Sequence, residues 1–342
     1  MMKPIKMNGI RLSDPHVLVN QSYTDDTCRD PVRLYQFLSA DEINISFLNI
    51  ISVNQQKHIA CCVAPDKLCY VQKYESIGSD TAQFGYQAEI GTLSIYPHKF
   101  SLNSLGYLIS ILARGKYKFY HMASSTSSLT FVVDYRVQEK MAADLSREID
   151  LPGSHTPFRQ ERCDDEQLLI RKAFPETVAT YVESKIKCYG IDAKTDLSLC
   201  CLEIPVDQLE MWGKMIQSME TAGLRFQFAS ACLCANNRVQ LFLLIDTMDS
   251  IPAGQRDRVI SSFFPEGWKK MVKIKSPVAA IGFQGPHFGD RYGIANQAFS
   301  ALHVNEIPFY LAGCSGASIQ MVLPAAMLQK AKSSLLQVFA AP

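Results

Sequence analysis

Residues 276–324 read SPVAAIGFQGPHFGDRYGIANQAFSALHVNEIPFYLAGCSGASIQMVLP, and this stretch decides the fold of the 342-residue chain. An apolar run ends in a glycine-bearing loop, the loop opens an amphipathic segment, and two further apolar runs follow. Short apolar runs bounded by turn residues predict strands, whereas an apolar stripe at i, i+3 and i+4 predicts a helix packed on a sheet. The stretch therefore predicts the order strand, helix, strand, strand.

The same order can be read three more times upstream in weaker form, so the chain resembles four copies of one small unit. First strands are expected at 16–23, 89–97 and 197–205, each followed by a helix, a hairpin and a second helix. The second copy shows this most clearly, because Ser101 can cap a helix. Its apolar stripe is Leu105, Leu108, Ile109 and Leu112, and Gly115 is expected to be left-handed after the last turn.

These repeats predict an α+β fold of four tandem ferredoxin-like βαββαβ units, with antiparallel sheets and helices on one face. Fourth strands are expected near 83–88, 156–162 and 268–274, whereas the last copy ends without one. The expected units span 7–88, 89–163, 197–275 and 276–342, with a charged helical connector at 164–196.

Composition limits the classes of function. The formal net charge is +1, which argues against nucleic acid or an acidic membrane as the main partner. The N-terminus has no apolar leader, no run is long enough to cross a bilayer, and a cytoplasmic protein is expected. The eleven cysteines lie mostly in apolar strand candidates without CxxC pairs, so buried thiols are expected and neither a metal nor a cofactor. No phosphate-binding loop, nucleophile elbow or HExxH motif is present in the sequence.

The segment GFQGPHFGDRYGIANQAFSAL followed by EIPFYLAGCSGASIQMVL resembles an ACT domain of the aspartate kinase regulatory type, without the kinase domain. The positions that match that family's pattern are Gly285, Gly293, Ile294, Ala295, Phe299, Leu302 and Ile307. The first copy matches more loosely, through Leu34, Phe37, Leu38, Asn44 and Ile45. The two middle copies match by pattern alone.

The resemblance implies that an amino acid binds between the first loop of one unit and the second strand of its neighbour. Loop glycines and a helix N-terminus can present N–H groups to a carboxylate. The implied cradle is Gly285, Phe288, Gly289, Asp290, Gly293, Ile294 and Ala295, and the facing wall is Ala312, Gly313 and Cys314. The corresponding positions of the first copy are Asn20, Ser22, Asp25 and Asn49. The family often places Asp or Gln on the second strand, where this chain has Leu48 and Tyr310.

Three functions remain open at this point. The first is a non-catalytic regulatory protein that senses an amino acid or a similar small anion, with units paired within one chain or across a homodimer. The second is a protein–protein interaction module, such as the regulatory subunit of a biosynthetic enzyme like aspartate kinase, which would dock through an unfinished sheet edge. The third is an enzyme of unrecognised type. For the loop itself, the alternative is that its glycines only permit tight turns.

Overall fold

The computed structural model describes residues 4–24, 33–53, 56–77, 82–99, 101–153, 185–247, 251–286, 288, 291–315 and 318–342. In these residues the order strand, helix, strand, strand, helix occurs four times. The first stretch holds β2 (His16–Thr24), α1 (Leu34–Ala40), β3 (Phe47–Val53), β4 (Gln56–Val63) and α2 (Leu68–Ile77). The second holds β5 (Gln83–Pro97), α3 (Leu102–Arg114), β6 (His121–Ser124), β7 (Leu129–Asp134) and α4 (Gln138–Glu148).

The third stretch holds β9 (Gly190–Pro205), α6 (Leu209–Thr221), β10 (Leu224–Cys234), β11 (Arg238–Thr247) and α7 (Arg256–Ser262). The fourth holds β12 (Val272–Gln284), α8 (Ile294–Val304), β13 (Leu311–Ser315), β14 (Ser318–Pro324) and α9 (Leu328–Val338). Three short strands lie outside this order: β1 (Met7–Leu12), β8 (Ile186–Lys187) and β15 (Phe339–Ala340). No described helix combines the length and the apolar character needed to cross a membrane.

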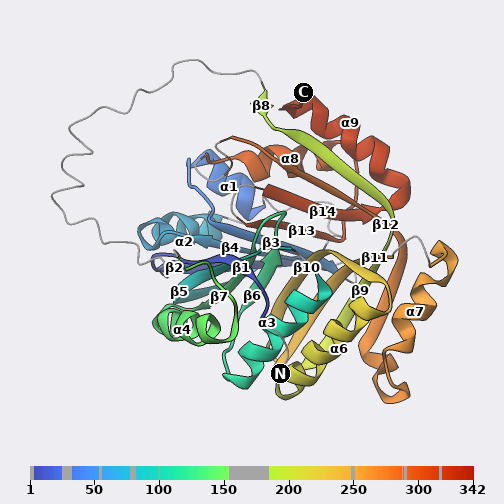
Figure 1. Cartoon of the computed structure of the whole chain (residues 1–342). Helices are drawn as coiled ribbons and strands as arrows, with labels where there is room; N and C mark the ends of the chain where they lie inside the picture. The colour runs from blue at the N-terminus through green and yellow to red at the C-terminus, as the bar shows by residue number, and fades with distance from the viewer. Residues whose placement is uncertain are drawn as a thin grey trace.

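Thirteen of these strands form one antiparallel sheet, in the order β1-β5-β2-β4-β3-β13-β14-β12-β9-β11-β10-β6-β7. The last strand, β7, also pairs with β5, so the sheet curls round and closes on itself. The fold thus combines a large antiparallel sheet with helices that cover it (Figure 1).

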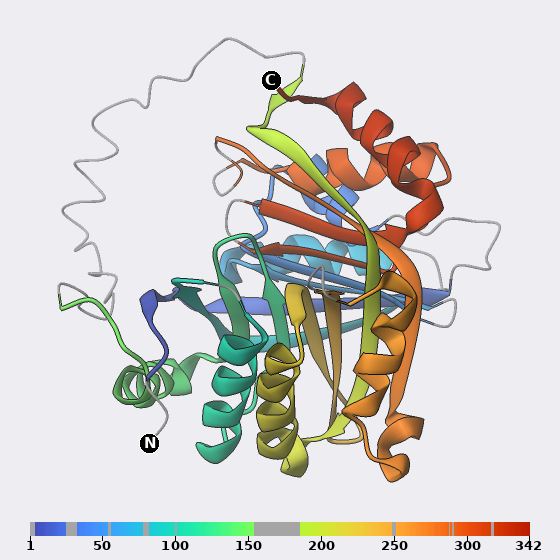
Figure 2. The same cartoon turned by 45° about the vertical axis from the view of Figure 1, so that its right-hand side comes forward.

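The closed sheet has two halves, and each joins two of the four stretches. The first and fourth stretches, here called the outer pair, meet where β3 pairs with β13. The second and third stretches, called the inner pair, meet where β6 pairs with β10. The long strands β5, β9 and β12 run through both halves, and Figure 2 shows β9 and β12 passing from one half to the other.

The two halves face each other, and helices cover the outside of each, so the molecule has four layers (Figures 1 and 2). One apolar core lies under α3, α6, α4 and α7 of the inner pair, and another under α1, α8, α9 and α2 of the outer pair. Between the two halves lie smaller clusters that include Phe47, Phe228 and Phe242. Most strands of the sheet are consequently buried on both faces.

The local sequence explains why α3 begins where it does. The Ser101 hydroxyl accepts a hydrogen bond from the Ser104 N–H at 3.0 Å, while Ser104 Oγ accepts one from the Ser101 N–H at 3.0 Å. This reciprocal capping satisfies two donors at the helix start. The expected apolar stripe of α3 is buried as well. The expected left-handed Gly115 is wrong, because Gly115 has φ −72° and the chain turns left-handed one residue later, at Lys116.

The structure also corrects the expected ends of the units. The fourth stretch does not lack a last strand, because Gly190–Lys194 of β9 pairs with Ala280–Gln284 of β12. Those β9 residues were expected in a helical connector, but 186–187 and 190–196 are strand. Residues 164–184 of that connector and the expected strand at 156–162 lie outside the described residues. The expected strand at 83–88 is part of β5. Of the strand expected at 268–274, only 272–274 lie in β12, because 268–271 belong to a short 3-10 helix (Glu266–Met271).

Candidate functional site

The seam of the outer pair is a run of backbone pairing between two strands far apart in the sequence. In β3 and β13, Leu311 lies opposite Ile51, Gly313 opposite Asn49, and Ser315 opposite Phe47. On the helix-bearing face, α1 and α8 lie beside each other across this seam, with the rings of Tyr35 and Phe299 5.2 Å apart. The seam therefore joins two β-α-β-β-α stretches within one chain.

The loop after β12 is held tightly at its start. A Cβ at Gly285 would lie 2.4 Å from the Lys187 carbonyl oxygen of β8, so only glycine fits at this approach. Phe288 is 6% exposed and packs its ring against Phe283 and Phe339, at centroid distances of 5.9 and 6.1 Å. The loop thus packs its own aromatic side chain against β12 and the C-terminal strand.

The other end of this loop opens α8. Gly293 precedes the helix with φ +81°, a left-handed conformation that favours glycine. A Cβ there would also lie 2.9 Å from Ser39 Oγ of α1, across the seam. Nearby, the Tyr292 hydroxyl donates to the Glu42 carboxylate at 2.9 Å. The helix start is therefore fixed against the first stretch, both by close packing and by a hydrogen bond.

A small cavity of about 30 Å³ lies between the start of α8 and the start of β3. Its lining comes from both stretches: Asn44, Ile45, Leu48, Phe288, Arg291, Tyr292, Gly293, Ile294, Ala295, Cys314 and Ile319. The first N–H groups of a helix have no acceptor within the helix, and they carry a partial positive charge. Together with the guanidinium of Arg291, they make this cavity suited to a small anion.

The thiol of Cys314 adds no charge to the cavity. Burial raises the pKa of Cys314 to about 12, so the thiol stays protonated at neutral pH. Arg291 is exposed at the mouth, where its charge can attract an anion before binding. The electrostatic character of the cavity therefore comes from the helix start and from Arg291.

Five of the residues expected to bind ligand line this cavity together: Phe288, Gly293, Ile294, Ala295 and Cys314. Gly285 lies at the start of the same loop, whereas Gly289 and Asp290 lie outside the described residues. Ala312 is fully buried in the core under the helices of the outer pair. Gly313 faces the other half of the sheet, where a Cβ would lie 3.0 Å from the Phe228 ring.

The positions expected in the first copy do not gather at a cavity. Asn49 is 1% exposed and lies between the two halves, where it accepts a hydrogen bond from Ser230 at 2.8 Å. Asn20 also faces the other half and contacts His121 Nε2 at 3.1 Å. Ser22 pairs with His58 Nδ1 at 2.8 Å on a partly exposed part of β2. Asp25 lies outside the described residues.

A second small cavity of about 30 Å³ lies at the other end of the seam. It is lined by Tyr23, Arg33, Tyr35, Ile50, Lys57, Phe299, His303, Ile307 and Phe309. Arg33 is 4% exposed, and its guanidinium donates to His303 Nδ1 at 2.8 Å. The sequence analysis missed Arg33 and His303. Arg33 directly precedes α1, the first helix of its stretch, as Gly293 precedes α8, the first helix of the fourth stretch, and this correspondence is the signal that would have identified it.

No protein-family model and no curated protein matches this sequence. Among solved structures, the fold is similar to that of aspartate kinase from Synechocystis, with a TM-score of 0.75 and 14% identity. The regulatory subunits of aspartate kinase from Thermus thermophilus (ligand-free) and Thermus flavus align with TM-scores of 0.36 and 0.37 and identities of 12% and 13%. These two cover 42% and 44% of this chain, and 99% and 97% of their own. The alignment with the Synechocystis kinase covers 99% of this chain and 56% of that one, so the chain shares its fold over nearly its full length and spans little more than half of the larger protein.

Proposed function

We propose that the chain is a non-catalytic regulatory protein that binds an amino acid or a similar small carboxylate at the seam of the outer pair. In this proposal it consists of four ACT-like units, near 7–88, 89–163, 197–275 and 276–342. The pairing of strands supports a fourth strand for each unit, taken from β5, β1, β12 and β9 in turn. The bounds would change accordingly, because β1 (Met7–Leu12) would belong to the second unit and residues 190–194 of β9 to the fourth. The first unit would then be inserted in the second, and the third in the fourth.

The observation that carries the proposal is the start of α8 facing β3 across a cavity. A carboxylate there can accept hydrogen bonds from the free N–H groups of the first helical turn, and Arg291 adds a full positive charge. Glycine at 293 lets the backbone reach this position in a left-handed conformation. The neighbouring wall from residues 44, 45 and 48 closes the site from the other stretch.

The size of the cavity gives the proposal its regulatory consequence. A cavity of about 30 Å³ is far below the range of about 300–1,000 Å³ found for small-molecule sites, so an amino acid fits only if the lining moves. Phe288 and Tyr292 are large side chains of the lining, and Tyr292 links the loop to Glu42 of the first stretch. Binding would therefore shift an equilibrium between a closed and an open seam, by no more than the ligand's difference in affinity for the two.

A thermal-shift experiment with each standard amino acid tests the proposal. A ligand at 100 times its dissociation constant adds about 2.7 kcal/mol to the free energy of unfolding, so one or a few amino acids should raise Tm. Ala295→Met places a longer side chain in the first turn of α8 and should remove that rise. Ala280→Met, on the opposite face of the sheet and two strands away from β13, is the matched control and should keep it. A well-folded wild-type protein with the same Tm in every amino acid would overturn the proposal.

The unfinished edge that would favour the interaction-module alternative is paired, because β9 lies against β12 there. The alternative itself stays a prediction. A homodimer stays a prediction. The seam is completed within one chain, so the proposed site needs no second copy. Regulation of a partner enzyme, such as an amino-acid biosynthetic kinase, is the context in which a sensor of this kind would act, and it too stays a proposal.

A further inference from the structure

The two halves of the sheet are not in contact everywhere. A cavity of about 270 Å³ lies between them, on the face opposite the helices. We call it the interlayer cavity, and its lining residues are Thr126, Asp192, Ala193, Lys194, Gln227, Phe228, Ala280, Ile281, Gly282, Gln320 and Met321. Elsewhere the same space is filled by apolar side chains such as Phe47 and Phe242. Here Ala280 and Gly282 are too small to fill it.

Irregular strand pairing surrounds this cavity. The register of β10 with β11 shifts between Phe226 and Phe228, which leaves Gln227 out of the ladder. The register of β12 with β9 shifts between Val278 and Ala280. Bulges of this kind turn a side chain away from its regular direction and are frequent beside binding sites. At one end, Thr126 of the β6–β7 hairpin donates to Gln284 of β12 at 3.1 Å, which ties the two halves together.

The polar groups of the cavity are rich in acceptors. The Gln320 Oε1 atom is buried and has no hydrogen-bond partner among the described residues, and such a group is costly to leave unpaired. Asp192 forms no ion pair with any residue of the described ranges. Lys194 is already paired with Asp246, with Nζ 2.5 Å from Oδ2. With Lys194 paired to Asp246, which lies outside the lining, the Asp192 carboxylate is the charge of the lining that has no ion-pair partner among the described residues. The Gln320 Oε1 atom lacks a donor in the same part of the chain.

We propose that the interlayer cavity binds a small primary amine. The ammonium group would donate hydrogen bonds to the Asp192 carboxylate and to the Gln320 side-chain carbonyl. Its hydrocarbon part would lie over Ala280 and Gly282, against the Phe228 ring. This site differs from the seam in both place and charge, because the seam cavity is lined by a helix start and an arginine. The inference therefore stands independently of the proposed function.

The volume also agrees with a small ligand. The cavity is close to the lower end of the range of about 300–1,000 Å³ found for small-molecule sites, and it is several times larger than either seam cavity. It requires no opening of the lining before a molecule of a few heavy atoms can enter. An apolar floor with a few convergent polar groups is the usual composition of such sites.

Calorimetric titration of the full chain with n-butylamine tests this inference. Two probes of similar size serve as controls: butyrate, which carries a negative charge, and 1-butanol, which carries none. We expect saturable binding of n-butylamine alone. Asp192→Asn keeps the shape of an exposed side chain and should weaken binding about tenfold or more, because the ammonium group then bonds to a neutral amide oxygen and no longer to a charged carboxylate. Gln320→Glu replaces an amide by a charged acceptor and should strengthen binding several-fold.

Two matched variants test whether n-butylamine binds in the interlayer cavity or at the seam. Ala280→Met fills the interlayer cavity and should abolish n-butylamine binding, whereas Ala295→Met fills the seam and should leave it unchanged. Binding that survives Ala280→Met, or butyrate binding as well as n-butylamine does, would overturn the inference, and so would wild-type protein that shows no saturable binding. Loss of the amino-acid response at the seam with n-butylamine binding intact would refute only the proposed function.

Discussion

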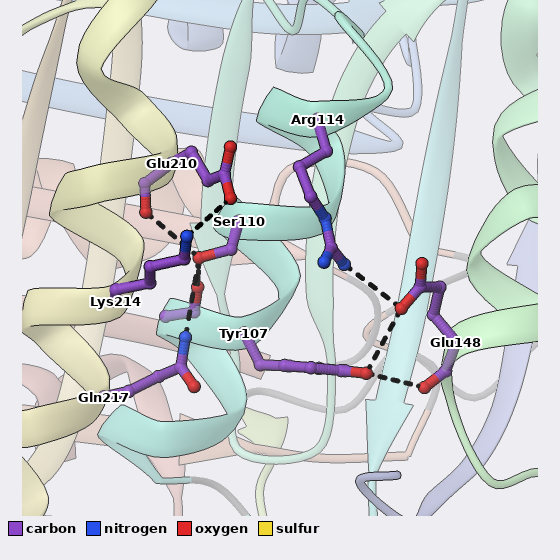
Figure 3. A network of polar contacts seen from close by, with 8 residues as sticks. Tyr107, Ser110, Arg114, Glu148, Glu210, Lys214 and Gln217 are labelled. Carbon is purple, nitrogen blue, oxygen red and sulfur yellow. Dashed lines mark hydrogen bonds and ion pairs between the residues drawn. The ribbon is translucent and has the colours of Figure 1, made fainter. Parts of the chain in front are cut away.

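Replacing Gly106 by alanine tests the packing of the inner pair, where α3 and α6 lie side by side. Figure 3 shows this contact, with Ser110 on α3 between Glu210 and Gln217 of α6. A Cβ at Gly106 would lie 2.3 Å from the Gly213 carbonyl oxygen, whereas real Cβ atoms essentially never approach within 3.0 Å. The nearest atoms belong to the backbone of α6, so the two helices must move apart.

The sign of the change in stability distinguishes between two arguments about this substitution. Helix propensity alone predicts that alanine stabilises the helix by about 1 kcal/mol relative to glycine. Overpacking a well-filled contact costs about 1–3 kcal/mol. Moving the helices apart also stretches the hydrogen bonds of Ser110 to the Glu210 carbonyl and of Gln217 to Ser110, which are already 3.3 and 3.5 Å long. We therefore expect a net loss of about 1–2 kcal/mol in the free energy of unfolding.

Urea unfolding followed by tryptophan fluorescence measures this directly. The chain has two tryptophans, Trp212 and Trp268, whose rings stack at 4.6 Å beside α6, so the signal comes from the inner pair. Ser218→Ala, on the exposed face of α6, is the control and should change stability by less than about 0.5 kcal/mol. A Gly106→Ala protein that is more stable than the wild type would refute the close approach of the helices.

Three further outcomes follow from the structure. Burial, and to a smaller extent the charge of His58, lowers the pKa of His121 to about 4, so the unfolded chain binds more protons between pH 6.5 and 4. Stability should therefore fall by up to about 3 kcal/mol as pH decreases through this window, and parallel pH profiles for wild type and His121→Gln would contradict this. Gly293→Ala should lower Tm, because a left-handed backbone at an alanine costs about 1–2 kcal/mol, whereas Gly293→Asn should lower Tm less. Equal Tm values for the two variants would contradict this reasoning. Asn49→Leu should lose about 1–3 kcal/mol in urea unfolding because the partners of its amide are left unpaired between the sheet halves, and an unchanged urea midpoint would argue against that position.

The order of helices and strands could be predicted from the sequence because it depends on local periodicity. The apolar stripe from Leu105 to Leu112 identifies one face of α3, and that face is buried. The partner of a strand end is a different matter, because Gly190–Lys194 pairs with residues about ninety positions later. No local pattern encodes that pairing, so the fourth unit was expected to lack its last strand.

The surroundings of the site side chains show a second limit of prediction from the sequence. Alternation correctly places Asn49 on the face opposite Leu48, but it does not say what covers that face. The sequence analysis expected helices on one face only, whereas the other half of the sheet covers the second face. Runs such as NISFLNIIS at 44–52 and LSLCCLEIP at 197–205 carried a signal, since nearly continuous apolar strands are typical of burial on both sides. Asn20 and Asn49 therefore became contacts between the halves.

Strand β12 links the two proposed sites, because successive side chains of a strand point to opposite faces. Phe283 faces the helices and packs on Phe288 at the seam loop, whereas Gly282 lines the interlayer cavity and Gln284 holds the hairpin that closes it. If a ligand at the seam displaces Phe288, the change reaches β12 through Phe283, one residue from the other site. Any resulting coupling must be reciprocal: an amino acid that alters amine affinity by some factor has its own affinity altered by the same factor. A strand that is paired on both sides can carry such coupling only through a second stable arrangement. The ladder of β12 with β9 is already interrupted on both sides of Val278, and the interruption between Val278 and Ala280 is the one beside the interlayer cavity.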